Sequence, residues 1–392
     1  MWLRANCRCP VCRDPGTGQR LVGITDLPAS PVVAEVRVSD ASVEVVFGPD
    51  GHQSVFGRDW LARYTGPADP AAADSRVEDA KHLWAAADRG HELPQGWWPR
   101  YLADPPHRAA CLSAVLTEGL VVLHDVPCEP GAVLAVARSL GYVRETNYGR
   151  LFDVRVEATP ANLAFTSLAI APHTDNPYRD PVPTLQLLHC LHGAADGGGG
   201  STLVDGFGAA AALRAEDPAA FACLTTTPVT FGYEDESTVL RATGPMIALD
   251  PRGRIRQVRV NGRSLLPVHL PAAEAAAFYA AYRCFAALIA RPDGTVTTRL
   301  SPGDCVIVDN TRILHGRAAF TDRGGGHDNT RRHLQGCYAD LDGLESALAV
   351  AARGLRPGQA RSGQARSGPA QSGQARSGPA QTGQARAGQA RP

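Results

Sequence analysis

The pattern of apolar and polar residues separates a short N-terminal segment from a longer one. Between Val32 and Phe47 apolar residues alternate with polar ones, which predicts a β-hairpin. Apolar positions with helical spacing follow at Phe56 and Trp60. We therefore expect residues 1–66 to form a small β-rich domain, which at this size needs a staple such as a metal ion.

The rest of the chain is expected to hold a linker over 67–95, rich in Pro, Ala and Asp at its start, and a main domain over 96–352. Helical periodicity predicts helices over 109–116, 132–140, 209–215, 218–224 and 274–289. Short β-branched or alternating runs predict strands over 119–123, 163–165, 184–190, 201–205, 295–300, 304–308 and 335–338. Mostly antiparallel strands with helices in blocks indicate an α+β fold, mainly β: a double-stranded β-helix, or jelly roll, with flanking helices.

The C-terminal part has a different composition. No large apolar residue follows Leu355, and pentads built from Gly, Gln, Pro, Ala, Arg and Ser take its place. Such a segment cannot bury a core. Residues 353–392 are therefore expected to be a disordered tail that catalysis does not need.

Charge and hydropathy narrow the classes of function. Lys+Arg and Asp+Glu balance at 39 each, which argues against a nucleic-acid partner. The balance hides a split, because residues 357–392 carry five Arg and no acidic residue. No apolar run looks long enough to span a bilayer and no signal peptide is apparent, so we expect no membrane partner and a cytoplasmic, reducing location.

Three of the ten cysteines stand close together near the N-terminus. Cys7, Cys9 and Cys12 fall within six positions, a density that packing does not explain, and His52 offers a fourth ligand on a turn. C-x-C-x2-C with a remote His predicts a structural Zn(II) site. Three free thiols near a frayed terminus are the alternative.

A second set of candidate ligands lies in the main domain. His173 and Asp175 are one residue apart, so on a strand or at its end both side chains point the same way. A remote His315 would complete two neutral nitrogens and one anionic oxygen on one face of a metal, the facial triad of non-heme Fe(II) oxygenases. Alone, His-x-Asp is a weak signal, which a satisfied surface pair at a strand end explains as well.

An arginine strengthens the prediction of a metal site. Downstream of His315, Arg332 opens an apolar, strand-like run. A guanidinium presents a rigid fork suited to a carboxylate. An arginine close to the iron is therefore suited to hold the far end of a dicarboxylate cosubstrate.

These motifs together resemble those of a known family. The segments that carry the resemblance are His173-Thr174-Asp175-x-Pro177, Leu185 to Cys190, Gly199, Val204 to Phe207, Asp309 to Arg317 and Arg332 to Tyr338, with Cys7, Cys9, Cys12 and His52 near the N-terminus. Over about residues 1–350 the chain looks like the γ-butyrobetaine dioxygenase and trimethyllysine dioxygenase family, within the taurine-dioxygenase-like 2-oxoglutarate oxygenases.

The resemblance implies a set of metal and cosubstrate residues. It places Fe(II) at His173, Asp175 and His315. It pairs Arg332 with the distal carboxylate of 2-oxoglutarate, with the hydroxyl of Ser201 near the same carboxylate. It also implies Zn(II) in the N-terminal domain and ascorbate as a reductant.

The resemblance further implies an aromatic cage for a quaternary ammonium group, which has no N–H to donate and is best met by ring faces. The matching positions are Tyr148, Phe152, Phe165, Asn176 and Tyr338, with Asn162 near the carboxylate end of the substrate. γ-Butyrobetaine enzymes carry Trp, Tyr and Tyr where this chain has Phe152, Phe165 and Asn176. These differences should weaken cation–π attraction.

The implied activity is hydroxylation of a small quaternary amine, first γ-butyrobetaine to carnitine, with trimethyllysine and trimethylaminoethylphosphonate as alternatives. A catalytically silent ligand-binding or zinc-scaffold protein is the alternative of another class. The presence of all three ligands together with Arg332 speaks against it. The resemblance also implies a homodimer.

Two departures from the family concern chain length. Members usually carry a strand and a hairpin before the segment that begins here at Met1, so we expect the gene product to start upstream. A run from Gly324 to His327 lengthens the loop between His315 and Arg332.

Overall fold

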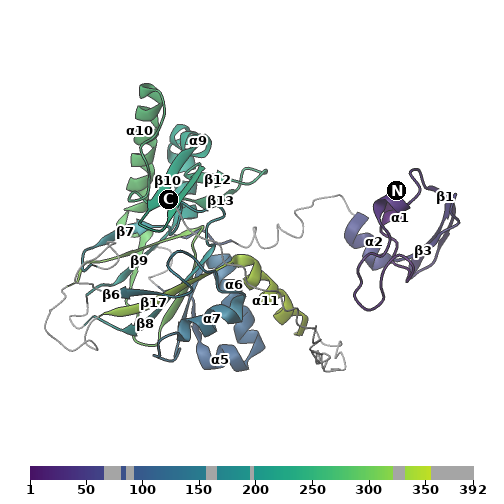
Figure 1. The fold of residues 1–392 in the computed structure, drawn as a ribbon, viewed down its shortest axis with the longest axis horizontal. Coiled ribbons are helices and arrows are strands. Elements are labelled where there is room, and N and C mark those ends of the chain that lie inside the picture. Colours follow the sequence, from purple (N-terminus) through teal and green to yellow (C-terminus); the bar gives the residue numbers. More distant parts are fainter. Residues whose placement is uncertain (66–80, 85–91, 156–165, 195–197, 321–331, 355–392) are drawn as a thin grey trace, which may run out of the picture.

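The computed structural model describes residues 1–65, 81–84, 92–155, 166–194, 198–320 and 332–354. Outside the described residues lie most of the predicted linker, the tail beyond residue 354, the predicted strand 163–165 and the lengthened loop 324–327. The N-terminal part and the main part are each described by themselves (Figure 1).

The N-terminal part is built on a three-stranded antiparallel sheet in the order β1-β2-β3, in which β1 and β2 are the expected hairpin. Val45, Phe47 and Phe56 are buried on one face, with Trp60 packed against them. So small a core contributes little stability by itself. The elements are α1 (Trp2–Ala5), η1 (Ile24–Asp26), β1 (Val32–Val38), β2 (Ser42–Gly48), β3 (Gln53–Gly57) and α2 (Arg58–Thr65).

Two sheets form the main part. The larger runs β4-β5-β15-β8-β17-β6, with only β4 and β5 parallel, and the smaller runs β14-β9-β16-β7, antiparallel throughout. The larger sheet consists of β4 (Gln95–Trp97), β5 (Leu120–His124), β6 (Phe152–Arg155), β8 (Leu185–His192), β15 (Cys305–Asp309) and β17 (His333–Ala339). The smaller consists of β7 (Ile170–His173), β9 (Ser201–Asp205), β14 (Thr295–Thr298) and β16 (Ile313–Arg317).

Apolar side chains fill the space between these sheets. Val122 and Val306 of the larger sheet share a buried cluster with Leu203 and Val296 of the smaller. Side chains alternate across a strand, so neighbouring residues such as Ile307 pack on the other face, against helices (Figure 1). Those helices are α5 (Trp98–Ala103), α6 (Pro105–Glu118), α7 (Ala132–Leu140) and α11 (Leu341–Gly354).

A third apolar cluster joins helices α8, α9 and α10 to two hairpins, β10–β11 and β12–β13. Neither hairpin is among the predicted strands. The strands of the second have only three and four residues, too few for an alternating pattern to stand out. The elements are α8 (Gly206–Glu216), α9 (Pro218–Thr226), β10 (Val229–Glu234), β11 (Val239–Gly244), β12 (Ile247–Leu249), β13 (Ile255–Val258), α10 (Ala272–Ile289) and η3 (Pro292–Gly294).

Helix α10 corrects one expectation. It has 18 residues with a mean hydropathy of 1.2, so by length and composition alone it reaches what a bilayer span needs. Much of this hydropathy comes from alanine. Phe278, Phe285 and Ile289 are buried against α8 and α9, and this role as a core helix accounts for the apolar stripe.

The prediction of an α+β fold with flanking helices is confirmed, but helices and strands contribute similar shares of the described residues, so the fold is not mainly β. The segment assigned to the linker, however, extends into the core. Trp84 and Leu93 are buried in the cluster between the sheets, and the Trp84 indole N–H donates to the carbonyl of Glu118 at 2.8 Å. The predicted linker was too long because Trp84 and Leu93 are isolated apolar residues. Without a repeating pattern, neither could be recognised as part of the core from the sequence.

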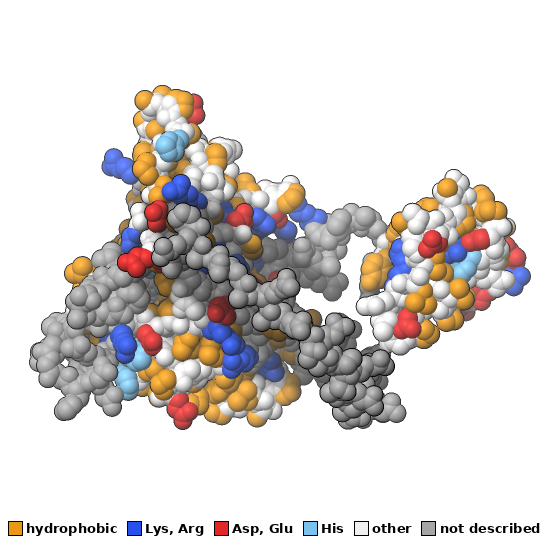
Figure 2. Space-filling view, viewed as in Figure 1, with side chains coloured by type: hydrophobic (Ala, Val, Ile, Leu, Met, Phe, Trp, Pro, Cys, Tyr) orange, Lys and Arg blue, Asp and Glu red, His pale blue; other side chains and the backbone are white. Residues whose placement is uncertain are grey.

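The surface carries charges of both signs. On the face shown in Figure 2, basic and acidic side chains are interspersed over both parts of the molecule. This agrees with the balanced composition. Among the described side chains visible on that face, charges of one sign do not gather into a large patch of the kind that binds a polyanion.

One ion pair of the main part is completely buried. The side chains of Arg312 and Asp205 are both 0% exposed, with Nη2 2.7 Å from Oδ2 and Nε 3.1 Å from Oδ1. Arg312 also donates to the backbone carbonyls of Thr117 and His82, and Asp205 accepts from the N–H of Phe207. The pair therefore ties the start of β16 to β9, α8, α6 and the described segment 81–84, which lies within the predicted linker.

Replacing Arg312 by Met should lower the free energy of unfolding by about 3–5 kcal/mol, because Asp205 then stays buried without a counter-ion. Arg291→Met is the matched control, since Arg291 pairs with Glu216 at the surface, where ion pairs contribute little. Urea unfolding of both variants measures the difference. Equally small shifts in the two would contradict a structural role for the buried pair.

Candidate metal and cosubstrate site

Three predicted ligands converge at one edge of the smaller sheet. His315 on β16 is paired opposite His173, the last residue of β7, so both imidazoles project from one face, with ring centroids 4.4 Å apart. Asp175 lies two residues beyond the strand. Its Oδ1 is 3.3 Å from His173 Nε2, and its Oδ2 is 3.9 Å from His315 Nε2. All three ligand atoms lie within 4.8 Å of one another, so one ion can contact them together.

The protonation states suit a divalent metal. The Nδ1–H of His173 donates to the carbonyl of Ala171 at 3.0 Å, which leaves the Nε2 lone pair free. Burial, and then the neighbouring His173, lower the pKa of His315 to about 3. Burial opposes ionisation of Asp175, but His315 and His173 together hold its pKa well below the usual range. The site thus offers the neutral imidazole of His315, the Nε2 atom of His173 and a carboxylate.

Two side chains fix the carboxylate of Asp175. Gln186 Nε2 donates to Oδ2 at 2.5 Å, and the hydroxyl of Tyr338 donates to the same oxygen at 2.8 Å. Oδ1 is left facing His173. Such outer contacts orient a ligand and make the other oxygen the freer donor to a metal.

A cavity of about 400 Å³ opens onto this group, and its size suits a small molecule. Arg332, predicted to hold the cosubstrate, lines it and is largely buried. Among the described residues no carboxylate contacts its guanidinium, which lies over the ring of Phe320. A Cβ at Gly199 would come within 3.1 Å of the Arg332 side chain, so that glycine leaves room for it. A guanidinium in a cavity wall that no described carboxylate contacts calls for an anion, and 2-oxoglutarate fits. Ser201, at the start of β9, lines the same cavity.

An aromatic wall lies on one side of the cavity. Tyr148, Phe152 and Tyr338, all predicted for a cage, line it, and the rings of Phe152 and Tyr338 are 5.1 Å apart. Tyr178 and Tyr233 join them, stacked with centroids 5.2 Å apart, and the hydroxyls of Tyr148 and Tyr178 lie 3.0 Å from each other. Neither ring is among the positions predicted for the cage, and Tyr233 comes from the unpredicted strand β10.

Asn176 also lines the cavity, but differently from the rings. It is 3% exposed with a φ of 53°, a left-handed conformation that Asn tolerates better than a bulky residue. Neither of its amide atoms has a hydrogen-bond partner among the described residues. A Tyr at position 176 would strain the backbone in this left-handed conformation. Asn therefore suits the local backbone as well as the cavity. The predicted contacts Asn162 and Phe165 lie outside the described residues.

Other cavity residues were missed from the sequence. Gln186 lies within strand β8. The sequence pattern there predicts a strand but does not indicate that Gln186 contacts Asp175. Arg317 shares a strand face with His315, two residues away, and donates to the carbonyls of Thr166 and Leu168. Arg263 follows β13 and carries no local signal, since an isolated arginine in a turn is common.

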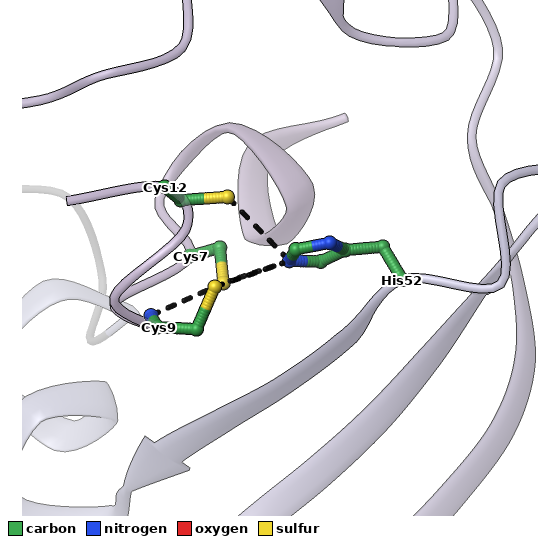
Figure 3. A group of neighbouring side chains, drawn as sticks. All are labelled: Cys7, Cys9, Cys12 and His52. Carbon is green, nitrogen blue, oxygen red and sulfur yellow. Dashed lines mark hydrogen bonds between the residues drawn. The ribbon is translucent and has the colours of Figure 1, made fainter.

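The N-terminal cysteines form the second ligand group. The Nε2 of His52 lies 3.1 Å from Cys7 Sγ, 3.6 Å from Cys9 Sγ and 3.5 Å from Cys12 Sγ. Figure 3 shows the three sulfur atoms gathered on the Nε2 side of the ring. Burial, and then the charge of Arg4, lower the pKa of His52, which favours the neutral imidazole that binds metal. Three thiols and one imidazole are a typical tetrahedral Zn(II) set.

The chain is similar to known proteins over most of its length. Residues 90–338 match the family model described as taurine catabolism dioxygenase TauD, TfdA family. A γ-butyrobetaine dioxygenase of Pseudomonas sp. (strain AK-1) is 38% identical over 353 residues, 90% of each chain. A trimethyllysine dioxygenase of Meyerozyma guilliermondii is 30% identical over 373 residues, 91% of each chain. The human γ-butyrobetaine dioxygenase is 28% identical over 356 residues, 89% of this chain and 90% of that one. On the family match and the identity to these relatives, the chain belongs to the TauD/TfdA family of dioxygenases.

Proposed function

We propose that this dioxygenase hydroxylates a small quaternary ammonium compound with an anionic end, and that the substrate is γ-butyrobetaine, which yields carnitine. The observation that carries the proposal is one cavity in which three features meet: the His173, Asp175 and His315 group, an Arg332 that no described carboxylate contacts, and an aromatic wall. The names of the relatives from Pseudomonas and human support this substrate.

In this proposal the two histidines and the aspartate hold Fe(II), and Arg332 with Ser201 binds the distal carboxylate of 2-oxoglutarate. When bound, Fe(II) and 2-oxoglutarate supply the oxidation by O2, with succinate and CO2 as co-products. The protein binds, orients and screens the reactants. Ascorbate is proposed as an external reductant that maintains Fe(II).

The aromatic wall is proposed to receive the trimethylammonium group. That group cannot donate a hydrogen bond, so ring faces are its best partners. Tyr148, Phe152 and Tyr338 are the predicted positions, and Tyr178 with Tyr233 adds two rings.

The anionic end of the substrate is assigned to Arg263. Its guanidinium borders the cavity, and no carboxylate contacts it among the described residues. The adjacent Ser264 is buried, and its hydroxyl also lacks a partner there. Arg263 and Ser264 are therefore suited to a substrate carboxylate that has no ammonium group beside it. Trimethyllysine carries an α-ammonium beside its carboxylate, which weakens the attraction to Arg263. Trimethylaminoethylphosphonate has an anionic end without that ammonium and remains the second candidate.

Finer points of architecture belong to the same proposal. We infer that the two sheets are the halves of a double-stranded β-helix, a view supported by the apolar cluster shared between them. The Cys7, Cys9, Cys12 and His52 group is proposed to hold structural Zn(II), supported by its geometry. A homodimer in the cytoplasm is proposed on the family resemblance, and light scattering of the purified protein tests the assembly.

His173→Ala should abolish both Fe(II) binding and succinate formation, because it removes one of three ligands. His269→Ala, at an exposed position, is the matched control and should leave both unchanged. Anaerobic Fe(II) titration and succinate release with γ-butyrobetaine measure the two effects. Continued 2-oxoglutarate turnover by His173→Ala would overturn the assignment.

Arg263→Gln should weaken γ-butyrobetaine binding roughly three- to tenfold, since it removes one partly exposed charge-assisted contact. Binding of butyltrimethylammonium, which lacks the carboxylate, should not change. Titration of the Fe(II) and 2-oxoglutarate complex with both ligands separates the effects, and trimethyllysine and the phosphonate complete the panel. Equal weakening of both ligands would place the carboxylate elsewhere.

Cys12→Ser should remove bound zinc and destabilise the N-terminal part, because a hydroxyl is a much weaker zinc ligand than a thiolate. Cys284→Ser, at an exposed cysteine, is the control. Metal content by mass spectrometry and thermal unfolding report the outcome. Full zinc occupancy in Cys12→Ser would exclude this site.

A further inference from the structure

The backbone around Asp175 poses a structural problem. Strand β7 lies at the edge of its sheet and ends at His173, so the peptide groups of Asp175 have no ladder partner on that sheet. The next residue, Asn176, turns into the left-handed region. A peptide buried without partners would leave this bend unstable and the ligand free to swing.

The side chain of Asn310 supplies the missing partners. Its Oδ1 accepts from the N–H of Asp175 at 2.7 Å, and its Nδ2 donates to the carbonyl of the same residue at 3.0 Å. The second N–H of the amide donates to the carbonyl of Pro183 at 2.8 Å. One primary amide thus pairs both polar groups of a single residue, as a neighbouring strand would.

Asn310 is itself rigidly held. It is 1% exposed, and its backbone N–H donates to the carbonyl of Thr184 at 2.9 Å. It lies in the turn between β15 and β16, five residues before His315. The residue therefore links the segment that carries one metal ligand to the segment that carries another.

The preceding residue is fixed by different partners. Thr174 exchanges hydrogen bonds with Val260, and its carbonyl accepts from Asn261 Nδ2 at 3.2 Å. These contacts hold the bend from the other side. Among the described residues, only Asn310 bonds to the backbone of Asp175.

We propose that Asn310 is a positioning residue, which sets the direction of the Asp175 carboxylate and its distance from His315 by gripping the Asp175 peptide. It touches neither metal nor substrate. The chemistry demands a primary amide, since the position needs one acceptor and two donors in one plane. An Asp at this position would keep the oxygen that accepts from the Asp175 N–H. Its second oxygen would replace Nδ2 and would face the carbonyls of Asp175 and Pro183 without a proton to donate.

The test compares two isosteric amide-to-acid changes, Asn310→Asp and Gln335→Glu. Gln335 is a good control because it is also buried, accepts from the N–H of Gly131 and donates to Asp153, away from the metal ligands. Both changes should lower the thermal unfolding midpoint. Only Asn310→Asp should disturb the metal site.

Metal binding is measured with Mn(II), which favours oxygen and imidazole ligands over the cysteine group, by the electron paramagnetic resonance signal of the free ion. We expect Asn310→Asp to weaken Mn(II) binding by about ten- to a hundredfold, as for other outer contacts of metal ligands. Gln335→Glu should stay within about twofold of the unchanged protein. The visible absorption band of the anaerobic Fe(II) and 2-oxoglutarate complex should shift only in Asn310→Asp.

The proposal is overturned if Asn310→Asp binds Mn(II) with unchanged affinity, or if Gln335→Glu weakens binding as much. Circular dichroism and zinc content show whether each variant is folded. If Asn310→Asp does not fold, Asn310→Ser provides the same comparison, because it removes the amide without adding charge.

Discussion

The register of β16 is the constraint on which the site depends, and the buried pair of Arg312 and Asp205 fixes it. Side chains on a strand alternate, so a slip of one residue would turn His315 to the opposite face. In the observed register Ile313 lies opposite Asp205, and Arg312, just before the strand, reaches back to that carboxylate. A slip in register would separate the buried charges of Arg312 and Asp205, which is strongly unfavourable in the protein interior. The pair thus contributes more to the choice of one register than to net stability.

From this register the metal site follows in steps. The antiparallel pairing of β16 with β7 sets His315 opposite His173. The third ligand lies beyond the end of β7, where no strand can position it. Side chains position this ligand instead. Asn310 binds the Asp175 backbone, and Gln186 and Tyr338 donate hydrogen bonds to its carboxylate. The sheet therefore positions the two histidines, and a small polar network positions the aspartate.

Local patterns predicted the fold class well, because buried strands and amphipathic helices leave a period in the sequence. His173, Asp175 and His315 could be proposed from chemistry and spacing, although Asp175 reaches the cavity through a bend rather than through strand alternation. Tyr178 and Tyr233 could not be paired, since their stacking joins segments 55 residues apart in sequence. The role of Trp84 was missed for the same reason: isolated residues acquire a role only through tertiary contacts.

The charges around the cavity bear on the order in which it is filled. Among the described residues that line it, Arg263, Arg317 and Arg332 face one carboxylate, that of Asp175. A divalent metal adds further positive charge, so the cavity without cosubstrate repels a quaternary ammonium ion. A dianion on Arg332 and the metal lowers that potential before the cation arrives. The aromatic wall then attracts the cation through its ring faces. Electrostatics alone thus favours 2-oxoglutarate first and the cationic substrate second, so that the substrate finds a cavity already prepared for oxidation.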